Sequence, residues 1–313
     1  MSVRLAQGLL TGMLLALLLC ACSSSEPVTP AVTVHTVTDA AGRSVAMPVW
    51  PPKRIVTLSP EATELAFWLQ ADDRVVGVSR FSNYPAATKD LPKVGGYTDF
   101  NVEAIAALRP DLVIGTIRGN PKDLVHVLET ASVPVFVMHA DGFEGIPATL
   151  RTLAALLYAP GPDLQRISSL IDTFETTAAR TVSGARKRIA SAGFAQAPGV
   201  VMLQYEPPIV AGADTLLDGL LTESGLINIG GRLKGRYPLV SAEALAALKP
   251  RVLLAVRMTS SGLSVQQKVQ RLRLGSPVVC ELDPDTSTRA TPRFLLSIEA
   301  LVSCLEAAAG NTP

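Results

Sequence analysis

Short apolar, β-rich runs alternate with amphipathic segments along most of the chain. The runs lie at 54–58, 75–79, 112–116, 135–139, 200–205, 252–256 and 278–282. Strands that alternate with helices form parallel sheets, so this order predicts an α/β fold. Ahead of the first run, residues 32–47 hold Asp39-Ala-Ala-Gly42 between alternating positions, which predicts a β-hairpin.

One long amphipathic segment separates the first four runs from the last three. From Pro162 to Ala190, apolar residues recur at steps of three and four, which is the period of a single helical face. Pro162 can open this helix and Gly193 can close it. A helix of this length spans about 42 Å. It suits a rigid connection between two lobes better than a helix packed inside one domain, because groups of strands flank it on both sides.

Two stretches separated by an offset of 140 residues repeat each other. Residues 101–116 read NVEAIAALRPDLVIGT and residues 241–256 read SAEALAALKPRVLLAV, with six of sixteen positions identical. In each copy an N-cap residue starts a short helix, a proline ends it and a buried strand follows. We therefore expect two related three-layer lobes with central parallel sheets, joined by the long helix and enclosing a ligand cleft. The expected boundaries are 34–161, 162–191 and 192–313.

The first 33 residues predict export and a lipid anchor. The stretch from Leu5 to Ser25 carries no charge, and its apolar run ends in small residues, as a cleavable signal does. Leu19-Cys20-Ala21-Cys22 resembles the bacterial lipobox, which implies a signal peptide over 1–21 and a diacylated Cys22. Residues 22–33, rich in Pro, Ser and Thr, then form a flexible tether. A plain secretory signal and an uncleaved anchor helix are the alternatives, and each also makes the domain extracytoplasmic.

Charge and composition narrow the class of protein. The chain has 28 Lys and Arg against 27 Asp and Glu, so no global field attracts nucleic acid. Its 48% of hydrophobic residues suffices for a large core. Cys280 and Cys304 remain in the mature chain, and an oxidising compartment allows them to pair. The sequence leaves open whether they form a bridge or two buried thiols.

Known catalytic and metal-binding motifs are missing from the sequence. It has no GxSxG elbow, P-loop, GxGxxG fingerprint or HExxH motif, and its three histidines do not cluster. We therefore expect no enzyme activity, no cofactor and no metal site. An exported esterase or metal-dependent hydrolase is the alternative from the enzyme class, and an adhesion or scaffold lipoprotein is the alternative from the structural class.

Aromatic residues gather in loops that follow strands or precede the repeated helices. The six are Phe81, Tyr84, Tyr97, Phe100, Tyr205 and Tyr237. Pockets lined by aromatic rings with a few polar groups bind flat, large ligands. Tyr84, before a proline, and Phe100, before an N-cap, are the two that we expect to pack structurally.

Several motifs resemble one family, the extracytoplasmic solute-binding proteins of bacterial ABC importers. The match is to the helix-strut class, which binds vitamin B12, ferric siderophores or haem. Residues 51–69 (PPKRIVTLSPEATELAFWL) and 93–116 (KVGGYTDFNVEAIAALRPDLVIGT) carry it, and it covers nearly the whole mature chain. Within the family, residues 76–85, 203–212, 236–245 and 285–293 look most like its vitamin B12-binding members.

The resemblance implies a function and a set of site residues. The chain would be a monomeric, membrane-anchored receptor that binds a cobalamin-like corrinoid between its lobes and delivers it to a permease dimer with ATPase subunits. The positions that match the ligand cleft are Phe81, Tyr97, Tyr205, Tyr237, Asp285 and Arg289. Tyr97, Tyr237 and Thr116 stand where those members have tryptophan, so the cleft loses ring area. Glu103 and Glu243 match the pair of exposed glutamates, one on each lobe, that dock against permease arginines.

Haem and ferric siderophores are the alternative ligands. Haem needs an axial ligand, for which Tyr97, Tyr237 or His139 is a candidate. An anionic siderophore needs several cations in the cleft, and the candidates are Arg80, Arg118, Arg236 and Arg289.

Overall fold

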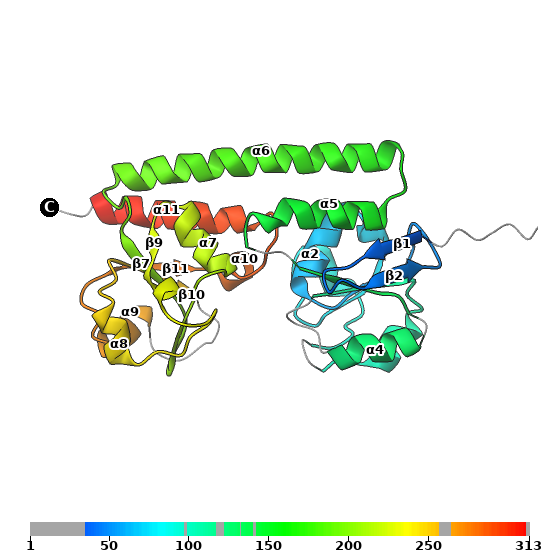
Figure 1. Ribbon diagram of the computed structural model, residues 1–313, viewed down its shortest axis with the longest axis horizontal. Helices are drawn as coiled ribbons and strands as arrows, with labels where there is room; N and C mark the ends of the chain where they lie inside the picture. Colours follow the sequence, from blue (N-terminus) through cyan, green and yellow to red (C-terminus); the bar gives the residue numbers. More distant parts are fainter. Residues whose placement is uncertain are drawn as a thin grey trace, which may run out of the picture. The chain divides into compact units, whose positions relative to one another are not determined.

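The structure is a computed structural model, and it describes residues 35–96, 99–116, 122–131, 133–139, 142–256 and 264–310. Tyr97, Arg118 and the whole predicted signal, lipobox and tether over 1–33 lie outside the described residues. Within the described part the chain forms a hairpin, two sheets and the helices that cover them (Figure 1).

The N-terminal lobe is built on a parallel sheet with strand order β4-β3-β5-β6. Its strands are β3 (Ile55–Thr57), β4 (Val75–Val78), β5 (Leu112–Thr116) and β6 (Val135–Met138). Its helices are α2 (Pro60–Trp68), α3 (Val102–Ala107), α4 (Lys122–Thr130) and α5 (Gly145–Leu157), with 3-10 turns at Asp72–Arg74 and Ala86–Asp90. The hairpin predicted ahead of them is present as β1 (His35–Thr38) and β2 (Ser44–Met47), paired antiparallel.

The C-terminal lobe is built on a mixed sheet with order β11-β10-β7-β8, and β9 also pairs with β7. The strands are β7 (Pro198–Tyr205), β8 (Pro208–Val210), β9 (Ile227–Asn228), β10 (Val252–Val256) and β11 (Val278–Leu282). The helices are α7 (Leu216–Glu223), α8 (Ala242–Ala247), α9 (Val265–Arg271), α10 (Pro284–Ser287) and α11 (Phe294–Gly310), with a 3-10 turn at Ile229–Arg232. β8 is antiparallel to β7, and the other pairings are parallel.

The long helix predicted between the two groups of strands is α6 (Pro162–Ser191), and it packs against α5 and α11 (Figure 1). Its buried residues follow the predicted stripe: Ile167, Ile171, Phe174, Ala178, Ala185 and Ile189. A single apolar cluster therefore runs from the N-terminal lobe through α6 into the C-terminal lobe. Phe143 and Phe294, from the two lobes, meet within it at a ring centroid distance of 5.4 Å.

The two copies of the sequence repeat fold in the same way. The side chain of Asn101 accepts the backbone N–H of Ala104 at the start of α3, and that of Ser241 accepts the N–H of Ala244 at the start of α8. Each helix then ends two residues before a residue with positive φ, Arg109 at 46° and Lys249 at 49°. The two repeated segments thus share their local backbone geometry, as the predicted relation between the lobes requires.

Within the described ranges, no helix is both long enough and apolar enough to cross a membrane.

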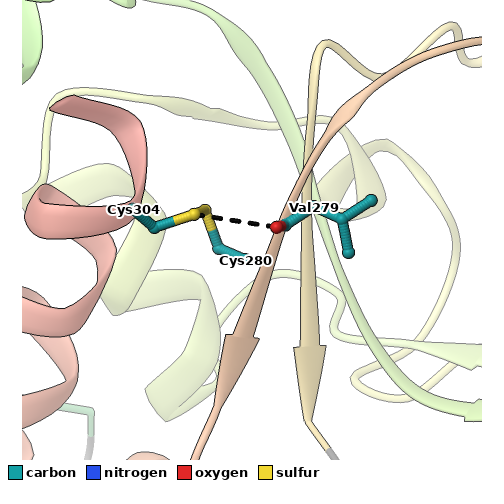
Figure 2. The surroundings of a disulfide bond; sticks show 3 residues. All are labelled: Val279, Cys280 and Cys304. Carbon is teal, nitrogen blue, oxygen red and sulfur yellow. Dashed lines mark hydrogen bonds between the residues drawn. A yellow bond between two sulfur atoms is a disulfide. The ribbon is translucent and has the colours of Figure 1, made fainter. Parts of the chain in front are cut away.

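A disulfide bond joins Cys280 on β11 to Cys304 on α11, with their Cα atoms 5.8 Å apart (Figure 2). The Sγ atom of Cys304 lies 3.7 Å from the carbonyl oxygen of Val279. This resolves the question that the sequence left open, in favour of the bridge. β11 is at an edge of its sheet, so the bond fastens an edge strand to the last helix.

Replacing both cysteines, Cys280→Ser with Cys304→Ser, should lower the free energy of unfolding by about 3 kcal/mol. The reason is that the bond closes a loop with a sequence separation of 24 residues, which restricts the unfolded chain. Urea unfolding under oxidising conditions measures the loss. Dithiothreitol should destabilise the wild type and leave the double variant unchanged, and equal stability of the two oxidised proteins would contradict the prediction.

Candidate ligand-binding site

Two of the aromatic residues predicted to contact a ligand are largely exposed. Phe81 follows β4 and is 50% exposed, and Tyr237, ahead of α8, is 52% exposed. The backbone N–H of Phe81 donates to the hydroxyl of Ser79 at 3.2 Å, which fixes the turn that presents the ring. An exposed aromatic ring offers a large, rigid apolar surface to any ligand that reaches it. Both rings are therefore accessible to a ligand.

Tyr205 is placed differently from these two. It ends β7 and is only 8% exposed, packed in the apolar cluster beneath α9 with the Lys268 ammonium 4.9 Å from its ring centroid. Among the described residues its buried hydroxyl has no hydrogen-bond partner. Burial, with the negative charge of Glu281, raises the pKa of Tyr205 to about 12. In this structure Tyr205 is a packing residue.

Asp285 and Arg289, the two residues predicted to make polar contacts with a ligand, lie next to each other. The Arg289 guanidinium donates to the Asp285 carboxylate at 2.5 Å. It also donates to the side-chain oxygen of Asn83 at 2.9 Å, and Asn83 in turn donates to Asp285 at 2.6 Å. Asn83 follows Phe81 by two residues in the other lobe. These polar side chains therefore link the lobes beside one of the exposed rings.

Glu64 belongs to the same group of contacts, although it is not among the site residues predicted from the sequence. It lies on α2 and is 4% exposed, and its carboxylate accepts from the Arg289 guanidinium at 2.6 Å. Arg293 donates to the same carboxylate at 2.9 Å. The sequence does hold a signal for Glu64. The other buried residues of α2 are apolar or carry a hydroxyl, and a charged residue among them is rarely buried without a partner.

Of the two aromatic residues expected to pack structurally, Phe100 is partly buried, whereas Tyr84 is 45% exposed. The Arg293 guanidinium stacks over the Tyr84 ring at 3.7 Å from its centroid, which is a further contact between the lobes. Phe100 packs against the apolar cluster on the outer face of the N-terminal sheet.

Arg80, a candidate cation of the site, is paired with Asp99. Hydrogen bonding from Arg80 is the main cause that lowers the pKa of Asp99. Gly96 permits this pairing, since a Cβ there would lie 2.5 Å from a guanidinium nitrogen of Arg80. Arg80 and Arg289 are thus both matched by carboxylates.

Arg236 borders a cavity of 430 Å³ that Phe143, Asp214, Asp218 and Glu223 also line. Its buried Nε has no hydrogen-bond partner among the described residues. Thr116, expected in the cleft, is 6% exposed at the end of β5.

The two glutamates predicted to dock on a permease occupy equivalent exposed positions. Glu103 is the second residue of α3, and Glu243 is the second residue of α8. Hydrogen bonds from its own backbone N–H and from Ser241 lower the pKa of Glu243, so it is charged at neutral pH. Each lobe therefore presents a carboxylate at the same place on a repeated helix.

Within the part of the chain that the structure describes, no group of His, Cys, Asp or Glu side chains could hold a metal ion. His139 is partly buried after β6, and its backbone carbonyl accepts from the hydroxyl of Thr149 at 3.0 Å.

Two related α/β lobes on a long helix, with a polar group that bridges the lobes beside the exposed ring of Phe81, are the architecture of a solute-binding protein. Residues 55–275 match the family described as periplasmic binding protein. The chain belongs to this family. Proteins of this family lie outside the cytoplasm, bind a small-molecule ligand and deliver it to a transporter. This protein is therefore an extracytoplasmic binding protein and not an enzyme.

Curated relatives carry more specific names. The vitamin B12-binding protein of Salmonella typhimurium (strain LT2) is 31% identical over 265 residues, which cover 83% of this chain and 94% of the relative. The vitamin B12-binding protein of Vibrio campbellii is 30% identical over 250 residues, covering 79% of this chain and 87% of the relative.

Solved structures share the fold. The periplasmic vitamin B12 binding protein of Vibrio cholerae has a TM-score of 0.67 at 24% identity, covering 84% of this chain and 99% of its own. A periplasmic heme binding protein from Pseudomonas aeruginosa has a TM-score of 0.69, also at 24% identity, covering 82% of this chain and 94% of its own. The expected fold of two α/β lobes is confirmed.

The buried hydroxyl of Tyr205 predicts a pH dependence of stability. Its pKa is 10 in an ordinary environment and about 12 in the folded protein. Between these values the unfolded chain loses a proton that the folded protein keeps, so stability must fall as the pH rises through this window. Tyr205→Phe should make that fall shallower, and at neutral pH it should be neutral or stabilising because it removes an unpartnered polar group. Urea unfolding on either side of pH 10 tests this, and parallel curves for the two proteins would contradict it.

Proposed function

We propose that this protein is a lipid-anchored receptor that binds a cobalamin-like corrinoid between its lobes and delivers it to an ABC permease. The observation that carries the proposal is the half-exposed pair of rings, Phe81 and Tyr237, one from each lobe, at positions that match the corrin cleft of the vitamin B12-binding members. Relatives that bear that name at 30% identity or more support it.

The pairing of charges supports a corrinoid over an anionic siderophore. A corrinoid is a large flat macrocycle with a rim of neutral amides, so it needs aromatic contact and hydrogen bonds more than net charge. Arg80 and Arg289 are already matched by Asp99 and by Glu64 with Asp285. A ligand with several negative charges would have to break these pairs.

Haem is the second candidate, because heme-binding proteins are among the structures with this fold. Of the candidates for an axial ligand, Tyr237 and His139 lie in the described residues, and the ring of Tyr237 is the half-exposed one, whereas His139 is partly buried. An axial tyrosinate would give a shifted Soret band, and Tyr237→Phe would abolish it.

Calorimetric titration of residues 23–313 with cyanocobalamin tests the proposal. We expect a dissociation constant below 1 μM, which corresponds to binding more favourable than about −8 kcal/mol. Tyr237→Ala should weaken binding about tenfold or more, because it removes a large apolar contact. Val49→Ala, which also truncates an exposed apolar side chain, is the control and should bind normally. If cyanocobalamin does not bind, and haemin gives a shifted Soret band that Tyr237→Phe abolishes, the proposed ligand is wrong and haem replaces it.

Delivery to the permease is proposed to use Glu103 and Glu243. Reversing both charges, with Glu103→Lys and Glu243→Lys, should abolish uptake of the ligand in cells and leave its affinity for the isolated protein unchanged. The control is Asp73→Lys with Asp163→Lys, which makes the same change of charge at carboxylates that are 81% and 76% exposed. If the docking pair lost ligand affinity, or if the control lost uptake equally, this assignment would be wrong.

The anchor is proposed to be the diacylated Cys22, after removal of residues 1–21. The lipobox resemblance supports it, and the mass of the mature N-terminus tests it. A mass that matches an unmodified N-terminus would refute it.

A further inference from the structure

Glu64 is a buried carboxylate that the proposed function does not use. It sits on α2 with its side chain 2% exposed. A charge taken out of water is strongly unfavourable unless charged and hydrogen-bonding partners surround it. The identity of these partners therefore shows what the residue is for.

The partners of Glu64 come from the turn between α10 and α11, in the other lobe (Figure 1). Arg289 donates to one carboxylate oxygen at 2.6 Å and Arg293 to the same oxygen at 2.9 Å. The hydroxyl of Thr291, itself 1% exposed, donates to the other oxygen at 3.0 Å. Three donors from one short turn thus converge on a single side chain of the opposite lobe.

Arg289 is held on its other sides as well. Besides Glu64 it contacts Asn83 at 2.9 Å and Asp285 at 2.5 Å, and its side chain is 11% exposed. A planar guanidinium held by three acceptors has one orientation. The Asp285 side chain is 37% exposed, so this end of the group is the one that a ligand can reach.

We propose that Glu64 is a positioning residue for ligand binding. Its carboxylate holds the guanidinium of Arg289 across the junction of the lobes. The Asp285–Arg289 ion pair therefore has its ligand-binding geometry before the ligand arrives. Binding then avoids the ordering of two flexible side chains, which would otherwise weaken affinity. The ligand part of this inference rests on the proposed function, whereas the contact between the lobes does not.

A double-mutant cycle on residues 23–313, which contain the whole compact unit after Val34, tests the ligand part. With cyanocobalamin as the probe, Glu64→Gln should weaken affinity at least tenfold, because an amide removes the charge and one acceptor. In an Arg289→Met background the same change should alter affinity less than twofold, since Glu64 acts through Arg289. Equal loss in both backgrounds, or no loss in the wild-type background, would overturn the proposal.

A matched control and a second variant keep this test decisive. Glu299→Gln removes the same charge from a solvent-exposed pair with Arg188 and should leave affinity unchanged. Should Glu64→Gln fail to fold, Glu64→Asp keeps the charge and shortens the side chain by one methylene group. It too should weaken affinity severalfold, and unchanged affinity would overturn the proposal.

Hydrogen exchange of the ligand-free protein separates this proposal from the proposed function. Glu64→Gln should speed the exchange of backbone amides in residues 284–293 about tenfold or more, because that turn loses its anchor in the other lobe. Unchanged exchange would refute the positioning role. If exchange rose but the wild type bound no cyanocobalamin, the positioning of Arg289 would stand and the assignment of the ligand would fall.

Discussion

The burial of the apolar stripe of α6 is the constraint on which the rest of the structure depends. The stripe is buried from Ile167 to Ile189, and the helix packs on α5 in one lobe and on α11 in the other. Burial of apolar surface is the dominant favourable term in folding. Because the stripe is covered partly by each lobe, the lobes share one apolar cluster. Their separation is thereby set along α6, and the polar contacts between them form on a framework that already exists.

The group around Glu64 has the opposite physical character. Glu64 and Asp285 balance Arg289 and Arg293, so the four side chains carry no net charge. Buried ion pairs add little net stability compared with apolar packing, but they accept few alternative geometries. On the proposal above, the apolar cluster holds the lobes together and the ionic group sets how their ligand-facing side chains are oriented. The two sets of contacts meet near Phe294, which follows Arg293 directly.

Much of the fold could be predicted from the sequence, because periodicity and the repeat are local signals. They identified the hairpin, seven further strands (β3 to β7, β10 and β11) and α6. β9 was missed because two residues are too short for a period to show. β8 was missed because its three residues begin at Pro208, and a proline argues against a strand. The sequence did not decide whether Cys280 and Cys304 form a disulfide, because the distance between them depends on how α11 packs on β11.

The site was less predictable, because its contacts join distant segments. The resemblance selected Asp285 and Arg289, but it did not select Glu64, which contacts Arg289 from 225 residues away in the chain. No local pattern encodes such a contact. The same matching placed Tyr205 among the cleft aromatics, whereas packing under α9 buries its ring. A match between two sequences shows where a residue lies in the fold. Whether its side chain is exposed depends on the side chains that surround it.

These contacts also limit how the lobes can move. A wide opening would have to break the ring contact of Phe143 with Phe294, the stacking of Arg293 on Tyr84 and the bonds of Glu64, while α6 remained packed on both lobes. A ligand shifts the equilibrium between a closed and an open form only by the difference in its affinity for the two forms. That difference would have to exceed the free energy of all these contacts together. We therefore expect a receptor built in this way to bind its ligand with only small movements of the lobes. On the proposed function, a permease that contacts Glu103 and Glu243 would then find α3 and α8 at nearly the same spacing in the loaded and in the empty receptor. It would have to distinguish the loaded from the empty receptor by the surface that the ligand itself alters.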